Sequence, residues 1–112
     1  MTDAFPEIDV READRLARSG EVLLLDVREL DEWHAGHAPA AVNLPLAGAV
    51  PAAVPDDRPV VAICRSGNRS GQAASALAAA GRDVRNVTGG MKAWAAADLP
   101  VVDGAGRPGA VA

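Results

Sequence analysis

One cysteine, Cys64, lies where a short apolar run meets a loop of small and basic residues. The loop that follows it reads Arg65-Ser66-Gly67-Asn68-Arg69-Ser70, and an alanine-rich stretch comes next. Main-chain N–H groups in such a loop, the N-terminus of a helix and two arginines all favour a thiolate. Comparable surroundings lower the pKa of a cysteine from about 8.5 to roughly 3.5–7.5. We therefore predict a thiol that is a nucleophile at neutral pH and within reach of solvent.

The alternative interpretation of Cys64 is a small core residue, because free cysteines are commonly buried and inert. A strand that simply ends in the core does not need the turn-forming residues Ser66, Gly67 and Asn68. These residues let successive N–H groups face inward and bind an anion. The loop therefore favours the reactive interpretation.

Short apolar runs alternate with helical segments along the whole chain, which is typical of an α/β fold. We predict a doubly wound, mainly parallel five-stranded sheet with helices on both faces. The predicted strands are Glu7-Ile8, Val22–Leu25, Ala41–Asn43, Pro59–Ile63 and Val84–Val87. The predicted helices are a segment between the caps Asp9 and Gly20, then Glu29–Ala35 with Leu30 and Trp33 facing inward, Ser70–Ala80 and Gly90–Ala96. Within Leu44–Pro55 we also predict a weak helix between prolines Pro51 and Pro55.

Ligands of open α/β sheets bind at the carboxyl ends of the strands. Asp26, Asn43, Cys64 and Gly89 each follow a predicted strand, so we expect them along one edge of the sheet. The 112 residues are enough for one domain, which we place at residues 1–102, with a flexible Gly/Pro/Ala-rich tail at 103–112.

Composition excludes several classes of partner. The net charge is −4, and no cluster of Lys and Arg could follow a nucleic-acid backbone. No run approaches the roughly 20 apolar residues that span a bilayer, and Met1–Pro6 does not resemble a signal peptide. His34 and His37 lack the further ligands that zinc requires. We expect a cytoplasmic, monomeric protein that binds neither nucleic acid nor membrane and holds no metal.

Two more blocks of motif residues accompany the loop Cys64–Ser70. One comprises Leu25–Arg28, Glu32-Trp33 and Gly36–Pro45, and the other is Val87–Trp94. In this order the three blocks resemble the rhodanese (thiosulfate sulfurtransferase) superfamily in its single-domain form. The resemblance implies a sulfurtransferase without cofactor, in which Cys64 takes sulfur from a small anionic donor, thiosulfate or a persulfide, and passes it to a thiol or cyanide.

The resemblance also implies roles for particular residues. Arg65 and Arg69 would orient the anionic donor, and the loop from Arg65 to Ser70, including Ser66, Gly67 and Asn68, would bind it and stabilise negative charge on sulfur. Four residues outside the loop would help to position it: Asp26, Arg28, Gly89 and Gly90. For Asp26 and Arg28 a structural ion pair is an equally good interpretation.

Two other functions remain open. One is a non-catalytic persulfide carrier or sulfur-sensing module that uses the same thiol. The other is a phosphatase or arsenate reductase, which in related folds has the spacing C-x5-R. Here Arg69 gives C-x4-R, and Ser70 occupies the longer register, where it cannot supply a guanidinium to grip an oxyanion.

Overall fold

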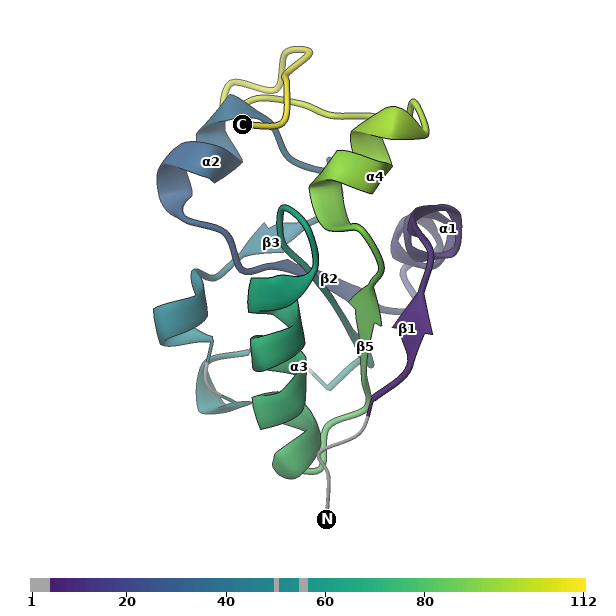
Figure 1. The fold of residues 1–112 in the computed structure, drawn as a ribbon, viewed down its shortest axis with the longest axis vertical. Coiled ribbons are helices and arrows are strands. Elements are labelled where there is room, and N and C mark those ends of the chain that lie inside the picture. Colours follow the sequence, from purple (N-terminus) through teal and green to yellow (C-terminus); the bar gives the residue numbers. More distant parts are fainter. Residues whose placement is uncertain (1–4, 50, 55–56) are drawn as a thin grey trace.

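The computed structural model describes residues 5–49, 51–54 and 57–112. Within them, five strands form one sheet in the order β1-β5-β4-β2-β3, and every pairing is parallel (Figure 1). The strands are β1 (Glu7–Ile8), β2 (Leu23–Asp26), β3 (Val42–Asn43), β4 (Val60–Ile63) and β5 (Val84–Val87). The helices are α1 (Val10–Ser19), α2 (Leu30–Ala35), α3 (Asn68–Ala79) and α4 (Gly90–Ala96). The predicted α/β class is confirmed.

Alternate residues of the central strands pack against opposite faces of the sheet. Leu23 and Leu25 belong to the core cluster beneath α3, whereas Leu24 belongs to the cluster beneath α1 and α4. β2 and β4 are buried along their whole length, which explains their continuous apolar sequences. Helices therefore cover both faces, as predicted (Figure 1).

The register brings the carboxyl ends of three strands to the same edge. Asp26 lies opposite both Asn43 and Ile63, and Cys64 follows directly. This alignment places the residues after β2, β3 and β4 next to one another, as the strand pattern predicts.

α2 departs from the prediction that Leu30 and Trp33 face the core. Leu30 is 56% exposed, and α2 contains no buried residue. Trp33 instead stacks on His37, with the ring centroids 3.5 Å apart. The prediction for Leu30 was wrong because α2 packs against the C-terminal segment rather than on a face of the sheet. Glu29 caps the helix, which therefore begins at Leu30.

Two boundaries also differ. α3 begins at Asn68 rather than Ser70, since Gly67, with φ +109°, serves as its N-cap. The segment Leu44–Pro55 contains two 3-10 turns among its described residues, η1 (Leu46–Gly48) and η2 (Pro51–Ala53). η2 lies in the stretch between Pro51 and Pro55 where we predicted a weak helix, and it is a single 3-10 turn rather than an α-helix. Pro55 lies outside the described residues.

Residues 103–112, which we expected to be a flexible tail, turn back over α2. The N–H of Gly104 donates to the His34 carbonyl, and the N–H of Ala110 donates to the Ala35 carbonyl. The contact is close at Gly36, where a Cβ would lie 2.7 Å from the carbonyl carbon of Ala110. The segment is thus held by main-chain bonds, and the domain boundary at 102 stays a prediction. In the described part of the chain, every helix is too short or too polar to cross a bilayer.

Candidate active site

Cys64 lies at the carboxyl end of β4, where its apolar run predicts it. Three residues of the following loop are exposed: Arg65, Ser66 and Asn68. Cys64 itself is 1% exposed. The expectation of a solvent-exposed thiol was therefore wrong for this conformation, because the loop curls over the sulfur in order to bring its N–H groups to it.

Two donors lie within hydrogen-bond distance of the sulfur. The N–H of Gly67 is 3.0 Å from Sγ of Cys64, and the hydroxyl of Ser70 is 3.2 Å from it. Burial alone would raise the pKa of the thiol. The Ser70 hydroxyl and the N–H groups of Ser70, Gly67 and Ser66 outweigh burial and lower the pKa below its ordinary value. The loop therefore stabilises a thiolate.

Asn86 supports the loop from β5. Its Nδ2 donates to the Gly67 carbonyl at 3.2 Å and to the Glu7 carboxylate at 3.0 Å. Sequence reasoning missed this residue, although a polar side chain in an otherwise buried strand is a detectable signal. Asn86 therefore ties the Gly67 carbonyl to β5 and helps to hold in place the loop whose Gly67 N–H donates to the sulfur.

Arg69 is held by Glu32 of α2. Its two terminal nitrogens donate to the two carboxylate oxygens at 2.6 and 2.9 Å. The Arg69 guanidinium lowers the pKa of Glu32 to about 2, against the opposing effect of burial. The same contact raises the pKa of Arg69, with a smaller contribution from Cys64. Arg69 therefore lies near the thiol with its charge balanced by Glu32, a partner that sequence reasoning did not assign.

Asp26 and Arg28 form a fully buried ion pair beside the loop. Nη2 of Arg28 lies 2.8 Å from Oδ2 of Asp26 and also donates to the Gly36 carbonyl at 2.7 Å. Their hydrogen bonds go to one another and to the chain around them, not to the loop 64–70. Nη1 of Arg28 is buried without a partner among the described residues. The geometry agrees with the structural interpretation of this pair.

Gly89 and Gly90 bring the start of α4 against the loop. Both have positive φ, +79° and +57°, and a Cβ on Gly90 would lie 2.6 Å from the Arg65 carbonyl oxygen. The N–H of Met91 donates to the Cys64 carbonyl at 2.7 Å, and the N–H of Lys92 to the Arg65 carbonyl at 3.0 Å. α4 thus fixes the main chain of the cysteine.

No group of three or more His, Cys, Asp and Glu that could bind a metal occurs in residues 5–49, 51–54 and 57–112. The arrangement instead places an activated sulfur inside a ring of N–H and hydroxyl donors, which suits nucleophilic attack and the storage of an anionic product.

Comparison with known proteins agrees with this chemistry. The family model for the Rhodanese-like domain matches residues 9–97. A sulfurtransferase of Allochromatium vinosum is 43% identical over 94 residues, which cover 80% of this chain and 87% of that protein. An HTH-type transcriptional regulator of Mycobacterium tuberculosis is 40% identical over 106 residues, and the match covers 89% of this chain but only 47% of the regulator. This chain therefore spans about half the length of that relative.

A solved structure also resembles this fold. The thiosulfate sulfurtransferase from Pseudomonas aeruginosa superposes with a TM-score of 0.80 at 27% identity, over 96% of this chain and 22% of that one.

Proposed function

Because this chain belongs to the rhodanese-like domain family, we propose that it is a sulfurtransferase in which Cys64 carries the transferred sulfur. The observation that carries the proposal is the pair of donors on Sγ, from Gly67 and Ser70. They stabilise the thiolate that attacks, and they can stabilise the persulfide anion that results.

The reaction proceeds in two steps. The Cys64 thiolate attacks the outer sulfur of thiosulfate, the Sγ–S bond forms, and the S–S bond of the donor breaks with its electron pair leaving on sulfite. A persulfide donor reacts in the same way and releases a thiolate. In the second step a thiol or cyanide attacks the outer sulfur of the enzyme persulfide and regenerates the Cys64 thiolate.

The burial of Cys64 limits what can react. With 1% of the residue exposed, only a small terminal atom can approach Sγ, and the loop residues over the sulfur must move apart to admit it. A single sulfur atom at the end of a donor meets this requirement. A bulky reacting group does not.

Mass spectrometry tests the proposal directly. Reduced protein is incubated with thiosulfate or with glutathione persulfide, and the mass of the peptide that contains Cys64 is measured. We expect the addition of one sulfur, which dithiothreitol removes. Cys64→Ser serves as the control and must gain none. Reduced protein that gains no sulfur from either donor contradicts the proposal.

A second function, sulfur sensing or persulfide carriage, is favoured by the likeness to the transcriptional regulator. In that case Cys64 stores sulfur for a partner rather than turning over. Steady-state transfer from thiosulfate to cyanide that is lost in Cys64→Ser supports the enzyme. A Cys64 persulfide that forms but is stable towards cyanide and small thiols supports the carrier.

A further inference from the structure

The charges around the thiol are not equally available to a donor. Both terminal nitrogens of Arg69 are occupied by Glu32, and this pair is only partly exposed, 32% for Arg69 and 19% for Glu32. An anion that approached the remaining N–H groups of Arg69 would meet a guanidinium whose charge Glu32 already balances. Arg69, which we expected to orient the donor, therefore attracts an anion less strongly than an unpaired cation does.

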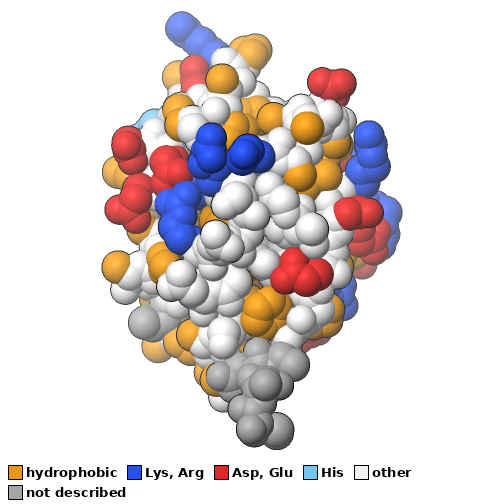
Figure 2. All heavy atoms as spheres, in the orientation of Figure 1, with side chains coloured by type: hydrophobic (Ala, Val, Ile, Leu, Met, Phe, Trp, Pro, Cys, Tyr) orange, Lys and Arg blue, Asp and Glu red, His pale blue; other side chains and the backbone are white. Residues whose placement is uncertain are grey.

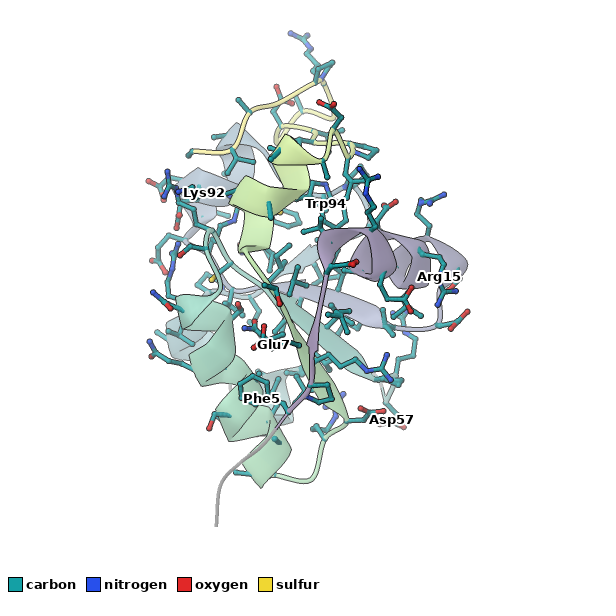
Figure 3. All side chains as sticks on the ribbon, turned by 45° about the vertical axis from the view of Figure 1, so that its right-hand side comes forward. Phe5, Glu7, Arg15, Asp57, Lys92 and Trp94 are labelled. Atoms are coloured by element: carbon teal, nitrogen blue, oxygen red, sulfur yellow. The ribbon has the colours of Figure 1, made fainter. Side chains whose placement is uncertain are left out.

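Lys92 is the only lysine in the chain, and α4 fixes its main chain beside the loop. Its N–H donates to the Arg65 carbonyl at 3.0 Å, and Gly90, which has no Cβ, lets the start of α4 lie close against the loop. The side chain is exposed, and its ammonium has no hydrogen bond or ion pair with any residue that the structure describes. Figure 3 shows Lys92 on the side of α4 that faces the loop leading into α3.

Arg65 lies on the loop, and its carbonyl accepts the hydrogen bond from the N–H of Lys92. Its Nε donates to the Ala112 carbonyl at 2.9 Å, which leaves the terminal nitrogens of the exposed guanidinium without a protein partner among the described residues. Figure 2 shows several blue side chains close together in the upper left part of this face, with red side chains on both sides of the molecule. Arg65 and Lys92 therefore place two cationic side chains on the segments that hold the main chain of Cys64, and Glu32 pairs with neither of them.

We propose that Lys92, together with Arg65, binds the anionic end of the sulfur donor and so determines the preference of the site for negatively charged donors. This inference rests on the proposed sulfur transfer and names the class of donor. The nucleophile is itself an anion, and the donor approaches it carrying further negative charge. Cations on the segments beside the thiol reduce that repulsion and speed the encounter.

The test compares donors that differ only in the charge of their tail. The donors are the persulfide of 3-mercaptopropionate, with a carboxylate tail, and the persulfide of 2-mercaptoethanol, with an uncharged tail. Thiosulfate is the third donor. The second-order rate constant for persulfidation of Cys64 is measured at low ionic strength. For Lys92→Gln we expect about a three- to fivefold loss with thiosulfate and the carboxylate donor, and no loss with the uncharged donor.

Arg11→Gln is the matched control, because it removes one positive charge from the exposed side of α1, which lies away from the loop in Figure 1. It should leave all three rates unchanged. Equal losses with all donors in Lys92→Gln, or no loss with any, would overturn the proposal.

Binding can be observed separately from sulfur transfer. In Cys64→Ala, which cannot react, reductive methylation with ¹³C-formaldehyde labels Lys92 as the only side-chain amine. We expect its resonance to shift saturably with thiosulfate and not with an equal ionic strength of chloride. Absence of the shift overturns the assignment of Lys92. Failure of every donor to persulfidate the wild-type chain, with the shift present, refutes the proposed sulfur transfer but not the anion site.

Discussion

Glu32 and Arg69 are 37 positions apart in the sequence, and their side chains form a two-point ion pair that joins α2 to the first turn of α3. The pair connects a helix that lies off the faces of the sheet to the loop that holds the thiol. Its strength therefore affects both the stability of the fold and the position of the loop.

Glu32→Gln should lower the free energy of unfolding by about 1–2 kcal/mol at neutral pH, after allowance for the partial exposure of the pair. The pKa of Glu32 is lowered from 4.5 to about 2, so the pair stabilises the fold above pH 4.5 and this stability is lost as the pH falls through about 2. Urea denaturation of both proteins across this range should show the difference shrinking towards acid pH. Asp31→Asn, an exposed acid on the same helix, is the control and should cost little. A difference that persists unchanged at acid pH contradicts the assignment.

Ser70→Ala should raise the pKa of the Cys64 thiol. The hydroxyl that donates to Sγ at 3.2 Å disappears, and burial, which favours the neutral thiol, is less opposed. The ultraviolet absorbance of the thiolate, followed against pH, measures the shift. Ser75→Ala, one to two turns further along α3, should leave the titration unchanged. An unaltered curve in Ser70→Ala would mean that main-chain N–H groups alone set the pKa.

Arg28→Met should destabilise the protein by about 3–5 kcal/mol, because it leaves the Asp26 carboxylate buried without its partner. The double variant Asp26→Leu/Arg28→Met removes both charges and should recover part of this loss. Urea denaturation of the single and double variants gives the coupling between the two residues. Strictly additive losses would show that the two side chains act independently.

Gly90→Ala should destabilise the fold and slow persulfidation of Cys64 together. Its φ of +57° disfavours alanine, and the added Cβ would lie 2.6 Å from the Arg65 carbonyl oxygen, so the loop has to move. Gly81→Ala isolates the conformational cost, about 1–2 kcal/mol, because φ there is +86° and nothing lies within 4 Å. We expect Gly90→Ala to cost more than Gly81→Ala and to be the only one of the two that affects the thiol. Equal costs and equal rates would contradict the close contact.

Much of this fold could be predicted from short stretches of the sequence. The apolar runs at β2 and β4 predict buried parallel strands, and they place Cys64 at the carboxyl end of β4. The small residues of the loop predict N–H groups that converge on sulfur, as the bond from Gly67 shows.

Contacts between distant segments could not be predicted in the same way. Nothing near Leu30 indicates that its helix would pack on residues 103–112 rather than on a face of the sheet. The ion pair that balances the charge of Arg69 also depends on where α2 lies in the fold. The hydrophobic periodicity of the sequence does not predict that position. The burial of Cys64 is likewise a property of how the loop curls, not of its composition.

The pairing of β1 with β5 has a consequence for biosynthesis. Glu7 lies opposite Asn86, so β1, which is translated before the other strands of this sheet, has no neighbour until β5 is translated. Until then the growing polypeptide exposes unsatisfied strand edges, which are sites for chaperones or for aggregation. β2, β3 and β4 can pair before β5 is made, but the docking of β1 is a late event. A ribosome that stalls before residue 84 leaves a chain in which β1 and β4 cannot gain their shared neighbour.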